Sequence, residues 1–196
     1  MADDTFYYFG YGSNMLLKKL QNDGSDGRPK RCPTAKPICI CWVENYEFSF
    51  GKLSQNDGSG KGNITKTEND KSVVYGVLFR IPENEKNALT DAEGAKNSRV
   101  GERSGRYERI DDFEVQTEKS DEFPDGVAKT VTYIATGTGT DDKTMQPFDW
   151  YKEQIVHGAI EGKLPVWYIK KIQQDFTTKT DKNRERDKLE RAYLPS

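Results

Sequence analysis

A glycine-rich turn near the start of the chain is the part of the sequence best suited to binding a ligand. An aromatic, strand-like run at residues 6–9 passes through Gly10 and Gly12 into a predicted helix, which Ser13 or Asn14 can cap. A strand that ends this close to a helix leaves backbone N–H groups without acceptors, and the helix dipole adds positive potential there. Glycines let a ligand approach the backbone closely. The turn therefore predicts a site for a carboxylate or another oxygen-rich group, and the alternative is a capped turn without a ligand.

A carboxylate at the end of a second helix is the other candidate for chemistry. Residues 82–94 are predicted to form a helix because proline stands at the start, glutamates stand in the first turn and glycine stands at the end. Asp91 and Glu93 lie in the last turn, where the helix dipole favours cations over anions. Departures of this kind often serve function, so Glu93 is a candidate general base. The alternative is a solvated Glu93 without a role.

The composition excludes several classes of partner. The chain has 196 residues, a net charge of −2, 34% hydrophobic residues and 32% charged residues. That length suits one domain, and the small net charge gives no overall attraction to nucleic acid or anionic lipid. No apolar run approaches the roughly 20 residues that a membrane-spanning helix needs. The acidic first residues contain no basic and apolar leader, so we expect a cytoplasmic protein that binds neither nucleic acid nor membrane.

Cysteine and histidine are too scarce to support a metal site or a nucleophile–histidine pair. The three cysteines, Cys32, Cys39 and Cys41, are an odd number, which argues against a disulfide framework. A zinc site would need further ligands at suitable spacing, and the single histidine, His157, is far away in the sequence. We therefore predict that the cysteines and His157 are structural, that no metal is bound, and that acid–base chemistry falls to carboxylates, tyrosines or lysines.

The order of elements indicates an α+β domain built around a small curved sheet or barrel with flanking helices. Strands are predicted at 6–9, 38–43, 46–50, 73–81, 107–115 and 127–135, and helices after the first turn and at 82–94, 147–158 and 165–176. The alternation within 107–115 is blurred, which indicates a bulge. Residues 54–62 are predicted to form a flexible turn or loop. We expect a single domain over 1–176, followed by a charged tail over 177–196 that is a solvated helix or partly disordered.

Several of these segments together resemble the gamma-glutamylcyclotransferase family. The segment Phe9-Gly10-Tyr11-Gly12-Ser13-Asn14-Met15 is similar to the Tyr-Gly-Ser-Asn signature of that family. The similarity continues, in the same order, through residues 74–79, 92–95, 105–107, 147–152 and 162–165. It covers about the first 170 residues. The opening signature is fairly specific and the glutamate in register strengthens it, whereas the later matches are looser.

The resemblance implies a small mixed barrel with flanking helices and an enzyme that releases 5-oxoproline from a small gamma-glutamyl substrate. By the same resemblance the base is Glu93, and no cofactor is involved. The implied substrate-holding residues are Tyr8, Phe9, Gly10, Tyr11, Gly12 and Ser13, with a family tyrosine carried onto Tyr151. The loop at residues 96–105 is longer than the family leads us to expect, which puts the shape of the pocket and the identity of the leaving amine in question. A homodimer is the default expectation.

The residues suit this chemistry because the substrate supplies its own nucleophile. The α-amine of a gamma-glutamyl compound can attack the side-chain carbonyl and close a five-membered ring, provided that a base removes its proton. Two rival functions remain open at this stage. The same reaction could act on a gamma-glutamyl-protected specialised metabolite or a gamma-glutamylamine, or the protein could be a non-catalytic ligand-binding or regulatory member of the fold. Glu93 argues against the last of these.

Overall fold

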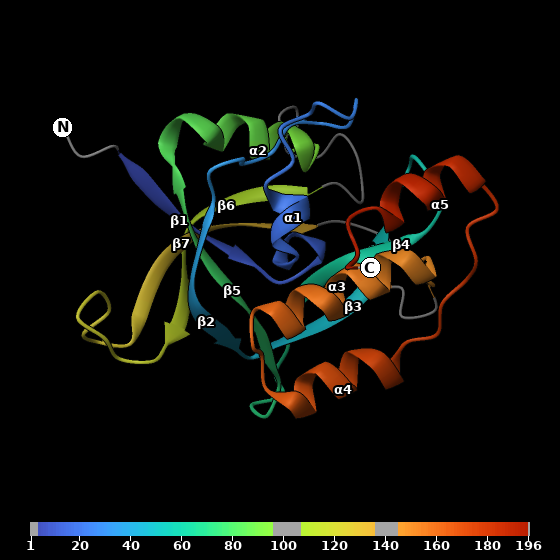
Figure 1. Ribbon diagram of the computed structural model, residues 1–196. Coiled ribbons are helices and arrows are strands. Elements are labelled where there is room, and N and C mark those ends of the chain that lie inside the picture. Colours follow the sequence, from blue (N-terminus) through green and yellow to red (C-terminus); the bar gives the residue numbers. More distant parts are fainter. Residues whose placement is uncertain (1–3, 96–106, 136–144, 196) are drawn as a thin grey trace.

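A closed five-stranded barrel forms the centre of the protein (Figure 1). The computed structural model describes residues 4–95, 107–135 and 145–195. The strands follow one another around the barrel in the order β1 (Thr5–Gly10), β5 (Val73–Pro82), β2 (Lys36–Glu44), β6 (Tyr107–Thr117) and β7 (Val127–Ala135). Neighbouring strands are antiparallel except β1 and β7, which run parallel where Tyr8 faces Val131. The expected mixed barrel with flanking helices is thereby confirmed.

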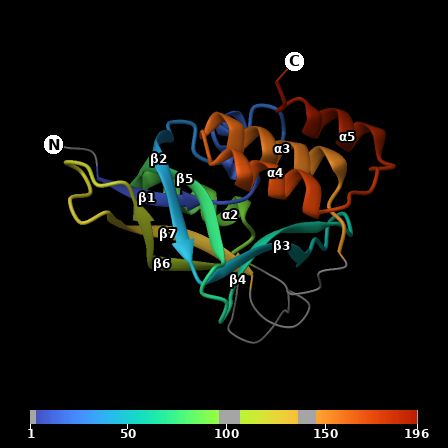
Figure 2. The same cartoon turned by 90° about the horizontal axis from the view of Figure 1, so that it is seen from below.

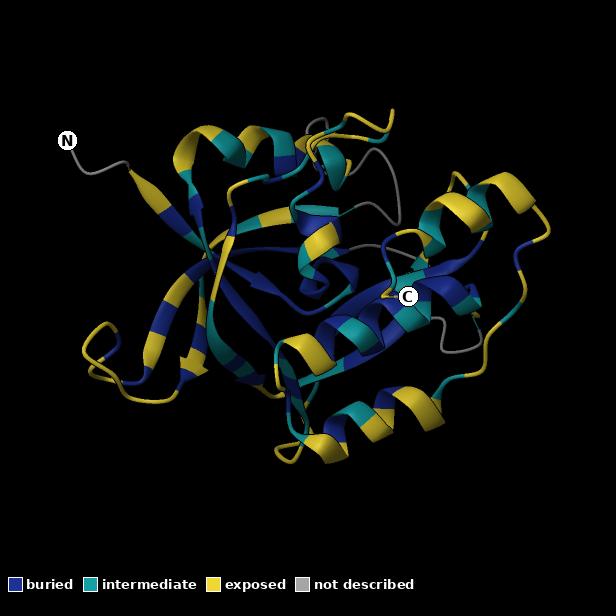
Figure 3. Ribbon diagram, viewed as in Figure 1, coloured by how far each residue is buried: buried dark blue, intermediate teal, exposed yellow. Residues whose placement is uncertain are grey.

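The two central strands are buried because their sequences are apolar on both faces. Phe9 in β1 and Leu78, Phe79 and Ile81 in β5 are all 0% exposed. Figure 3 shows the same contrast, since β1 and β5 are mostly dark blue whereas the outer faces of the C-terminal helices are yellow. The almost continuous apolar run of β5 thus forms the central strand that its sequence predicts.

Bulges and a close strand crossing let so short a sheet close on itself. The register of β6 and β7 shifts between Ile110 and Phe113, and Asp112 takes a φ of 57° there, so the expected bulge is confirmed. Gly76 in β5 passes so near the end of β1 that a Cβ atom on it would lie 2.4 Å from the carbonyl oxygen of Gly10. Only glycine allows the turn after β1 to rest against β5 in this way.

A separate hairpin stands beside the barrel. It consists of β3 (Tyr46–Leu53) and β4 (Gly60–Lys66), which pair in antiparallel fashion. The prediction that residues 54–62 are loop is wrong at its end, because β4 already begins at Gly60. The sequence of β4 is too polar to be recognised as a strand, and tertiary contacts stabilise it. The side chain of buried Asn63 accepts a hydrogen bond from the backbone amide of Ala135 at 2.8 Å and donates one to the carbonyl of Ala135 at 3.1 Å.

The C-terminal helices pack along one flank of the molecule, and α2 (Lys86–Ala92) lies apart from them (Figures 1 and 2). These helices are α3 (Asp149–Glu161), α4 (Val166–Asp175) and α5 (Arg184–Arg191). Helix α3 packs on α4, α5 and the first 3₁₀ turn, η1 (Ser13–Met15). Gly158 makes the last contact possible, because a Cβ atom on it would lie 2.4 Å from the amide nitrogen of Leu16.

The start of the first helix differs from the prediction. Neither Ser13 nor Asn14 caps it: η1 precedes a single short turn, α1 (Leu17–Leu20), and neither has a side-chain cap. The N-cap positions of η1 and α1 are Gly12 and Leu16, so Ser13 and Asn14 lie inside η1 and not ahead of a helix. The side-chain nitrogen of Asn14 donates to the hydroxyl of Tyr8 at 2.9 Å and to the carboxylate of Glu93 at 2.9 Å.

The charged segment after residue 176 packs on the domain. Loop and turn backbone flanks α5, and two residues there, Asp181 and Tyr193, are each only 5% exposed. Helix α5 itself has no buried residue, so the buried side chains of this segment lie on either side of it. The charged side chains of the segment form ion pairs: Arg186 lies 2.6 Å from Asp181 within the segment, and Glu190 lies 3.3 Å from Lys19 of the domain. No helix in the described parts of the chain is long and apolar enough to cross a membrane.

Candidate active site

A cavity of about 770 Å³ opens where the turn after β1, the end of α2, the β3–β4 connection and the C-terminal helices meet. Six of the eight residues predicted to form the site line it: Tyr8, Tyr11, Gly12, Ser13, Glu93 and Tyr151. These residues come from positions almost 150 apart in the sequence, and the fold brings them to the walls of one cavity. A cavity of this size belongs to the range of small-molecule sites.

The other two predicted residues, Phe9 and Gly10, do not line the cavity in the described structure. Phe9 is 0% exposed and stacks on Phe113 with ring centres 6.1 Å apart. A Cβ atom on Gly10 would lie 3.1 Å from the ring of Phe79. The physical reason is the strand itself, which turns Phe9 to the face opposite Tyr8 and packs Gly10 tightly against β5. Their contribution is to the core that supports the turn.

The end of α2 holds Glu93 in place through a helix-terminating hydrogen-bond motif. Gly94 has a φ of 69°, its amide donates to the carbonyl of Asp91 at 3.0 Å, and the amide of Ala95 donates to the carbonyl of Thr90 at 3.0 Å. This is the Schellman pattern that glycine after a helix favours. Glu93 is consequently the C-cap residue, just past the last turn of α2 rather than within it. Local sequence chemistry therefore determines where the carboxylate leaves the helix.

The carboxylate of Glu93 is bound on the cavity wall by two side chains from the N-terminal region. Its Oε1 atom accepts from Asn14 Nδ2 at 2.9 Å and from Arg31 Nη1 at 2.5 Å. The side chain of Glu93 is 15% exposed, and so is that of Arg31. Asn14 directly follows the glycine-rich turn, so the turn and the carboxylate form one site. A glutamate at a helix C-terminus is electrostatically unfavourable by itself, and Arg31 offsets that disadvantage.

Sequence reasoning missed Arg31. The segment that carries it is anchored because Arg31 donates its amide to the carbonyl of Asn22 at 2.8 Å and Cys32 donates to Leu20 at 2.9 Å. Burial opposes the charge of Arg31, but the neighbouring charge of Glu93 leaves the arginine pKa above its usual value. The only sequence signal is general: a partly buried carboxylate needs a cation nearby. Nothing in the sequence distinguishes Arg31 from the other arginines for this task.

Tyrosine hydroxyls make up much of the remaining wall. Burial, and then the charge of Glu93, hold the pKa of Tyr8 well above its usual value. Burial raises the pKa of Tyr151 to about 12, although hydrogen bonds from Gly62 and Ser13 act in the opposite direction. The amide of Gly62 donates to the Tyr151 hydroxyl at 3.2 Å. These phenols stay neutral near pH 7, so they serve as hydrogen-bonding groups and not as bases.

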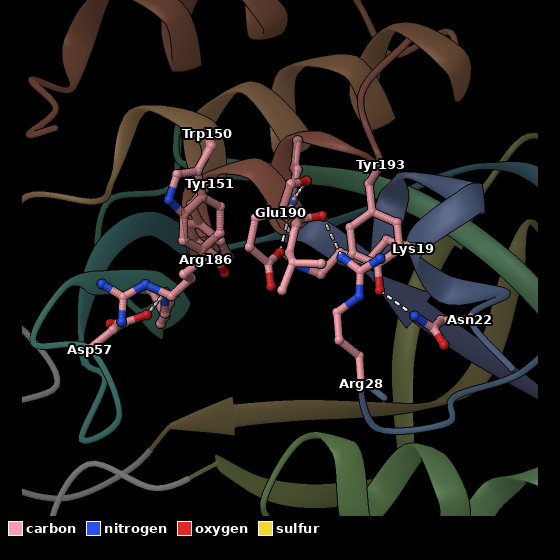
Figure 4. Close-up of polar contacts among 12 residues, drawn as sticks. Lys19, Asn22, Arg28, Asp57, Trp150, Tyr151, Arg186, Glu190 and Tyr193 are labelled. Carbon is pink, nitrogen blue, oxygen red and sulfur yellow. Dashed lines mark hydrogen bonds and ion pairs between the residues drawn. The ribbon is translucent and has the colours of Figure 1, made fainter. Parts of the chain in front are cut away.

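Basic side chains lie in the part of the cavity next to the C-terminal helices (Figure 4). Lys19 Nζ donates to Gln154 Oε1 at 2.6 Å and lies 3.3 Å from Glu190 Oε2. Burial lowers the pKa of Lys19 to about 8, against the opposing effect of Glu190. The same nitrogen lies 5.6 Å from the ring centre of Tyr151, and Lys61 Nζ lies 4.5 Å from it. The cavity thus extends beyond Glu93 into a second region, which the sequence did not predict.

The remaining candidates from the sequence play no part in this cavity as described. His157 is partly exposed on α3 and does not line it. Cys32, Cys39 and Cys41 are free thiols. Within the described residues, no group of three or more histidine, cysteine, aspartate or glutamate side chains is placed to hold a metal ion. The loop at residues 96–105, with Arg99 and Arg103, lies outside the described residues.

Comparison with known proteins places this chain in a family. The chain is 28% identical over 185 residues to human gamma-glutamylcyclotransferase, and the match covers 90% of this chain and 84% of the human protein. The mouse protein of the same name is 28% identical over 174 residues, covering 87% and 78%. A solved structure of a gamma-glutamyl cyclotransferase superposes with a TM-score of 0.67 at 25% identity, covering 96% of this chain and 99% of that one. Since the model of the AIG2-like family matches residues 73–172, just over half of the sequence, this chain belongs to the AIG2-like family.

Proposed function

We propose that this protein is a cofactor-independent gamma-glutamylcyclotransferase, which converts gamma-glutamyl amino acids, peptides or amines into 5-oxoproline and a free amine. The observation that carries the proposal is the position of Glu93. Its carboxylate lies on a cavity wall, 2.9 Å from Asn14 and thus next to the glycine-rich turn. A substrate held by the turn has the base within reach. Relatives from human and mouse that bear the name gamma-glutamylcyclotransferase support the assignment.

In the proposed reaction the substrate's α-amine is the nucleophile. The carboxylate of Glu93 takes a proton from the α-ammonium group, and the freed nitrogen lone pair attacks the γ-carbonyl carbon. The carbon–nitrogen bond to the leaving amine then breaks, and Glu93 returns a proton to the departing nitrogen. As the ring nitrogen becomes an amide it releases a second proton, which Glu93 passes to the departing nitrogen in the same way. One of the three ammonium protons thus remains on the ring nitrogen of 5-oxoproline, and the leaving amine departs as an ammonium ion with the other two. The five-membered ring closes readily because well-oriented intramolecular reactions reach effective molarities of about 10⁵ to 10⁸ M.

The turn supplies backbone donors for the negative charge of the substrate. The first hydrogen bond of η1 runs from the amide of Met15 to the carbonyl of Gly12 at 3.0 Å. The amides of Ser13 and Asn14 therefore have no acceptor within that turn. Gly12 leaves the approach to them open, since a Cβ atom there would meet nothing nearer than the hydroxyl of Tyr151 at 3.9 Å. We assign these donors to the α-carboxylate of the substrate or to the oxyanion that forms on its carbonyl.

The leaving group has room in the second region of the cavity. A volume of about 770 Å³ exceeds what a glutamyl group fills, and the region beside Lys19 and Lys61 continues from the wall formed by Tyr151. We also propose that the protein acts in the cytoplasm. Its three cysteines are all free thiols in the structure, which suits a reducing compartment. Fractionation of source cells with an antibody against the protein tests this placement.

A panel of gamma-glutamyl compounds tests the proposed activity directly. The purified protein is incubated with gamma-glutamyl dipeptides, longer gamma-glutamyl peptides and gamma-glutamylamines, and 5-oxoproline is measured. Turnover of the dipeptides supports the proposal, and turnover of the amines alone restricts the substrate class. Release of 5-oxoproline from none of them refutes it.

The substitution Glu93→Gln tests the assigned base. It keeps the size and the hydrogen-bond acceptor at Oε1 but cannot take a proton, so kcat should fall by about 10²- to 10⁴-fold while the fold persists. Glu83→Gln is the matched control, because it removes a carboxylate from the other end of the same helical segment. Glu83 forms an ion pair with Lys86 at 2.8 Å and does not line the cavity. An active Glu93→Gln enzyme would contradict the assignment.

A further inference from the structure

The side-chain amide of Asn14 has a fixed orientation. Its nitrogen lies 2.9 Å from the hydroxyl of Tyr8 and 2.9 Å from Oε1 of Glu93. An ionised carboxylate only accepts hydrogen bonds, so the atom that faces Glu93 must be the donor nitrogen, and both of its N–H groups are used. The oxygen, Oδ1, must therefore point away from these two partners. The hydrogen-bond network assigns this orientation without ambiguity.

The oxygen of Asn14 has no partner in the described structure. Asn14 is 5% exposed, and Oδ1 is buried without a hydrogen bond to any described residue. Among the buried side-chain oxygen and nitrogen atoms that lack a partner there, Asn14 Oδ1 alone belongs to a residue lining the large cavity. Buried acceptors are normally satisfied, so an exception in a residue that lines a cavity calls for an explanation, and a ligand that enters the cavity and takes up this acceptor supplies one.

A donor group that suits this position must also tolerate Glu93. The carboxylate of Glu93 lies 2.9 Å from Asn14 Nδ2, which shares its carbon with Oδ1, so a ligand group that reaches both Oδ1 and the carboxylate meets two acceptors, one of them negatively charged. A hydroxyl group has a single hydrogen to give, and an anion would be repelled. An ammonium group carries three N–H donors and a positive charge, and it satisfies both acceptors at once.

We propose that Asn14 Oδ1 is the binding group for the α-amine of the substrate. The proposal rests on the proposed cyclotransferase function, and it adds a residue and a role that the resemblance to the family did not supply. Asn14 accepts one N–H of the ammonium group while a second points at Glu93. When Glu93 takes that proton, the hydrogen bond to Asn14 keeps the nitrogen in place and leaves its lone pair directed at the γ-carbonyl carbon. Asn14 thus selects compounds with a free α-amine.

Binding of two matched probes tests the proposal. Gamma-glutamyl-alanine and glutaryl-alanine differ only in the α-amino group, which the second lacks. Calorimetry on the Glu93→Gln protein measures both affinities without turnover. We expect gamma-glutamyl-alanine to bind about tenfold tighter or more, since hydrogen bonds to charged groups are strong. Adding Asn14→Leu should reduce this preference to less than about threefold.

The substitution Asn14→Asp in the same Glu93→Gln background separates the acceptor from a structural role. Aspartate keeps an oxygen at the position of Oδ1 but cannot donate to Tyr8 or to residue 93. The preference for the amine should therefore persist at about tenfold or more. If the leucine variant does not fold, as judged by thermal unfolding, Asn14→Ser replaces it, because the shorter side chain draws its oxygen away from the ligand.

Three results would overturn the proposal. One is a preference for the amine that survives Asn14→Leu, and another is a preference that is lost in Asn14→Asp as well. The third is failure of the Glu93→Gln protein to bind gamma-glutamyl-alanine more tightly than glutaryl-alanine. Release of 5-oxoproline by the unmodified protein is assayed in parallel. If the unmodified protein turns over substrate while the binding preference fails, only the role of Asn14 is refuted, whereas absence of turnover refutes the proposed function.

Discussion

The substitution Gly158→Ala probes the contact between helix α3 and η1, which belongs to the turn that we propose binds the substrate. Gly158 lies in the last turn of α3, which ends at Glu161, and alanine is intrinsically favoured over glycine in a helix by up to about 1 kcal/mol. The new Cβ atom would lie 2.4 Å from the amide nitrogen of Leu16 and 2.5 Å from the carbonyl carbon of Met15. Ordinary contact begins at 3.4 Å, so α3 and η1 must separate by about 1 Å. These are backbone atoms, which cannot rotate away as a side chain does.

The steric cost outweighs the gain in helix propensity. Overpacking of a well-packed site costs typically about 1–3 kcal/mol, and the upper part of that range applies because backbone must shift. The free energy of unfolding should therefore fall by about 1–2 kcal/mol after the propensity gain is subtracted. For a chain of this size the melting temperature drops by about 2–4 °C per kcal/mol, which gives roughly 2–8 °C.

Activity should respond more strongly than stability. The displaced turn, η1, carries Ser13 and Asn14, and misplacement by about 1 Å at a reacting centre can cost 10²-fold in rate. Thermal unfolding and the rate of 5-oxoproline release are measured on the same preparations. His157→Ala is the control, since it introduces alanine at the neighbouring position of α3, which does not line the cavity. A Gly158→Ala protein that is as stable and as active as the unmodified one would show that helix propensity dominates and that the close approach does not matter.

Further predictions concern buried groups outside the reaction itself. Burial lowers the pKa of Lys19 to about 8, whereas an unfolded lysine titrates near 10.5, so the unfolded chain binds more protons between these two pH values. The free energy of unfolding should therefore rise with pH in this range, by at most about 1.4 kcal/mol per pH unit. Denaturant unfolding at several pH values should show this rise, and Lys19→Met should remove it; an unchanged slope in the variant would disprove the assignment. Burial raises the pKa of Cys32 to about 12 and that of Cys41 well above its usual value, so neither thiol forms the reactive thiolate near pH 7. A thiol reagent should therefore modify at most the partly exposed Cys39 before the protein unfolds. Mass spectrometry of the native protein checks this, and rapid labelling of Cys41 would contradict its burial. Tyr193→Ala removes a 5% exposed side chain that anchors the end of the chain, so limited proteolysis should cut the segment after residue 176 sooner, and unaltered resistance would indicate that α5 holds without it.

Elements with strong local signals were predictable from the sequence. The apolar run of β5 needs no particular partner to be recognised as a central strand, because any sheet that buries both faces demands it. The glycine at position 94 likewise ends α2 for a reason confined to the backbone, since a left-handed residue after a helix is favourable only for glycine. The placement of Glu93 at the C-terminal end of α2 follows from that signal.

Elements that depend on distant partners were not predictable in the same way. Strand β4 is polar and begins in a glycine-rich segment, and it is a strand because β3 pairs with it and Asn63 binds Ala135. The expected cap at Asn14 fails because Asn14 lies inside the 3₁₀ turn η1, where its side chain contacts Tyr8 and Glu93 from distant parts of the fold. The charged C-terminal segment is likewise ordered by ion pairs whose partners lie far away in the chain.

The sequence alone therefore determined the class of fold, the place of the glycine-rich turn and the choice of Glu93 as the candidate base. It could do so because glycines, helix ends and apolar runs act on the backbone within a few residues of their own positions. Only the tertiary structure decided what surrounds that carboxylate. Arg31 and Asn14 meet Glu93 across intervals of 62 and 79 residues, and Lys19 meets Glu190 across 171. No local pattern records such distances, since closure of the barrel and the packing of α3 on η1 bring these side chains together.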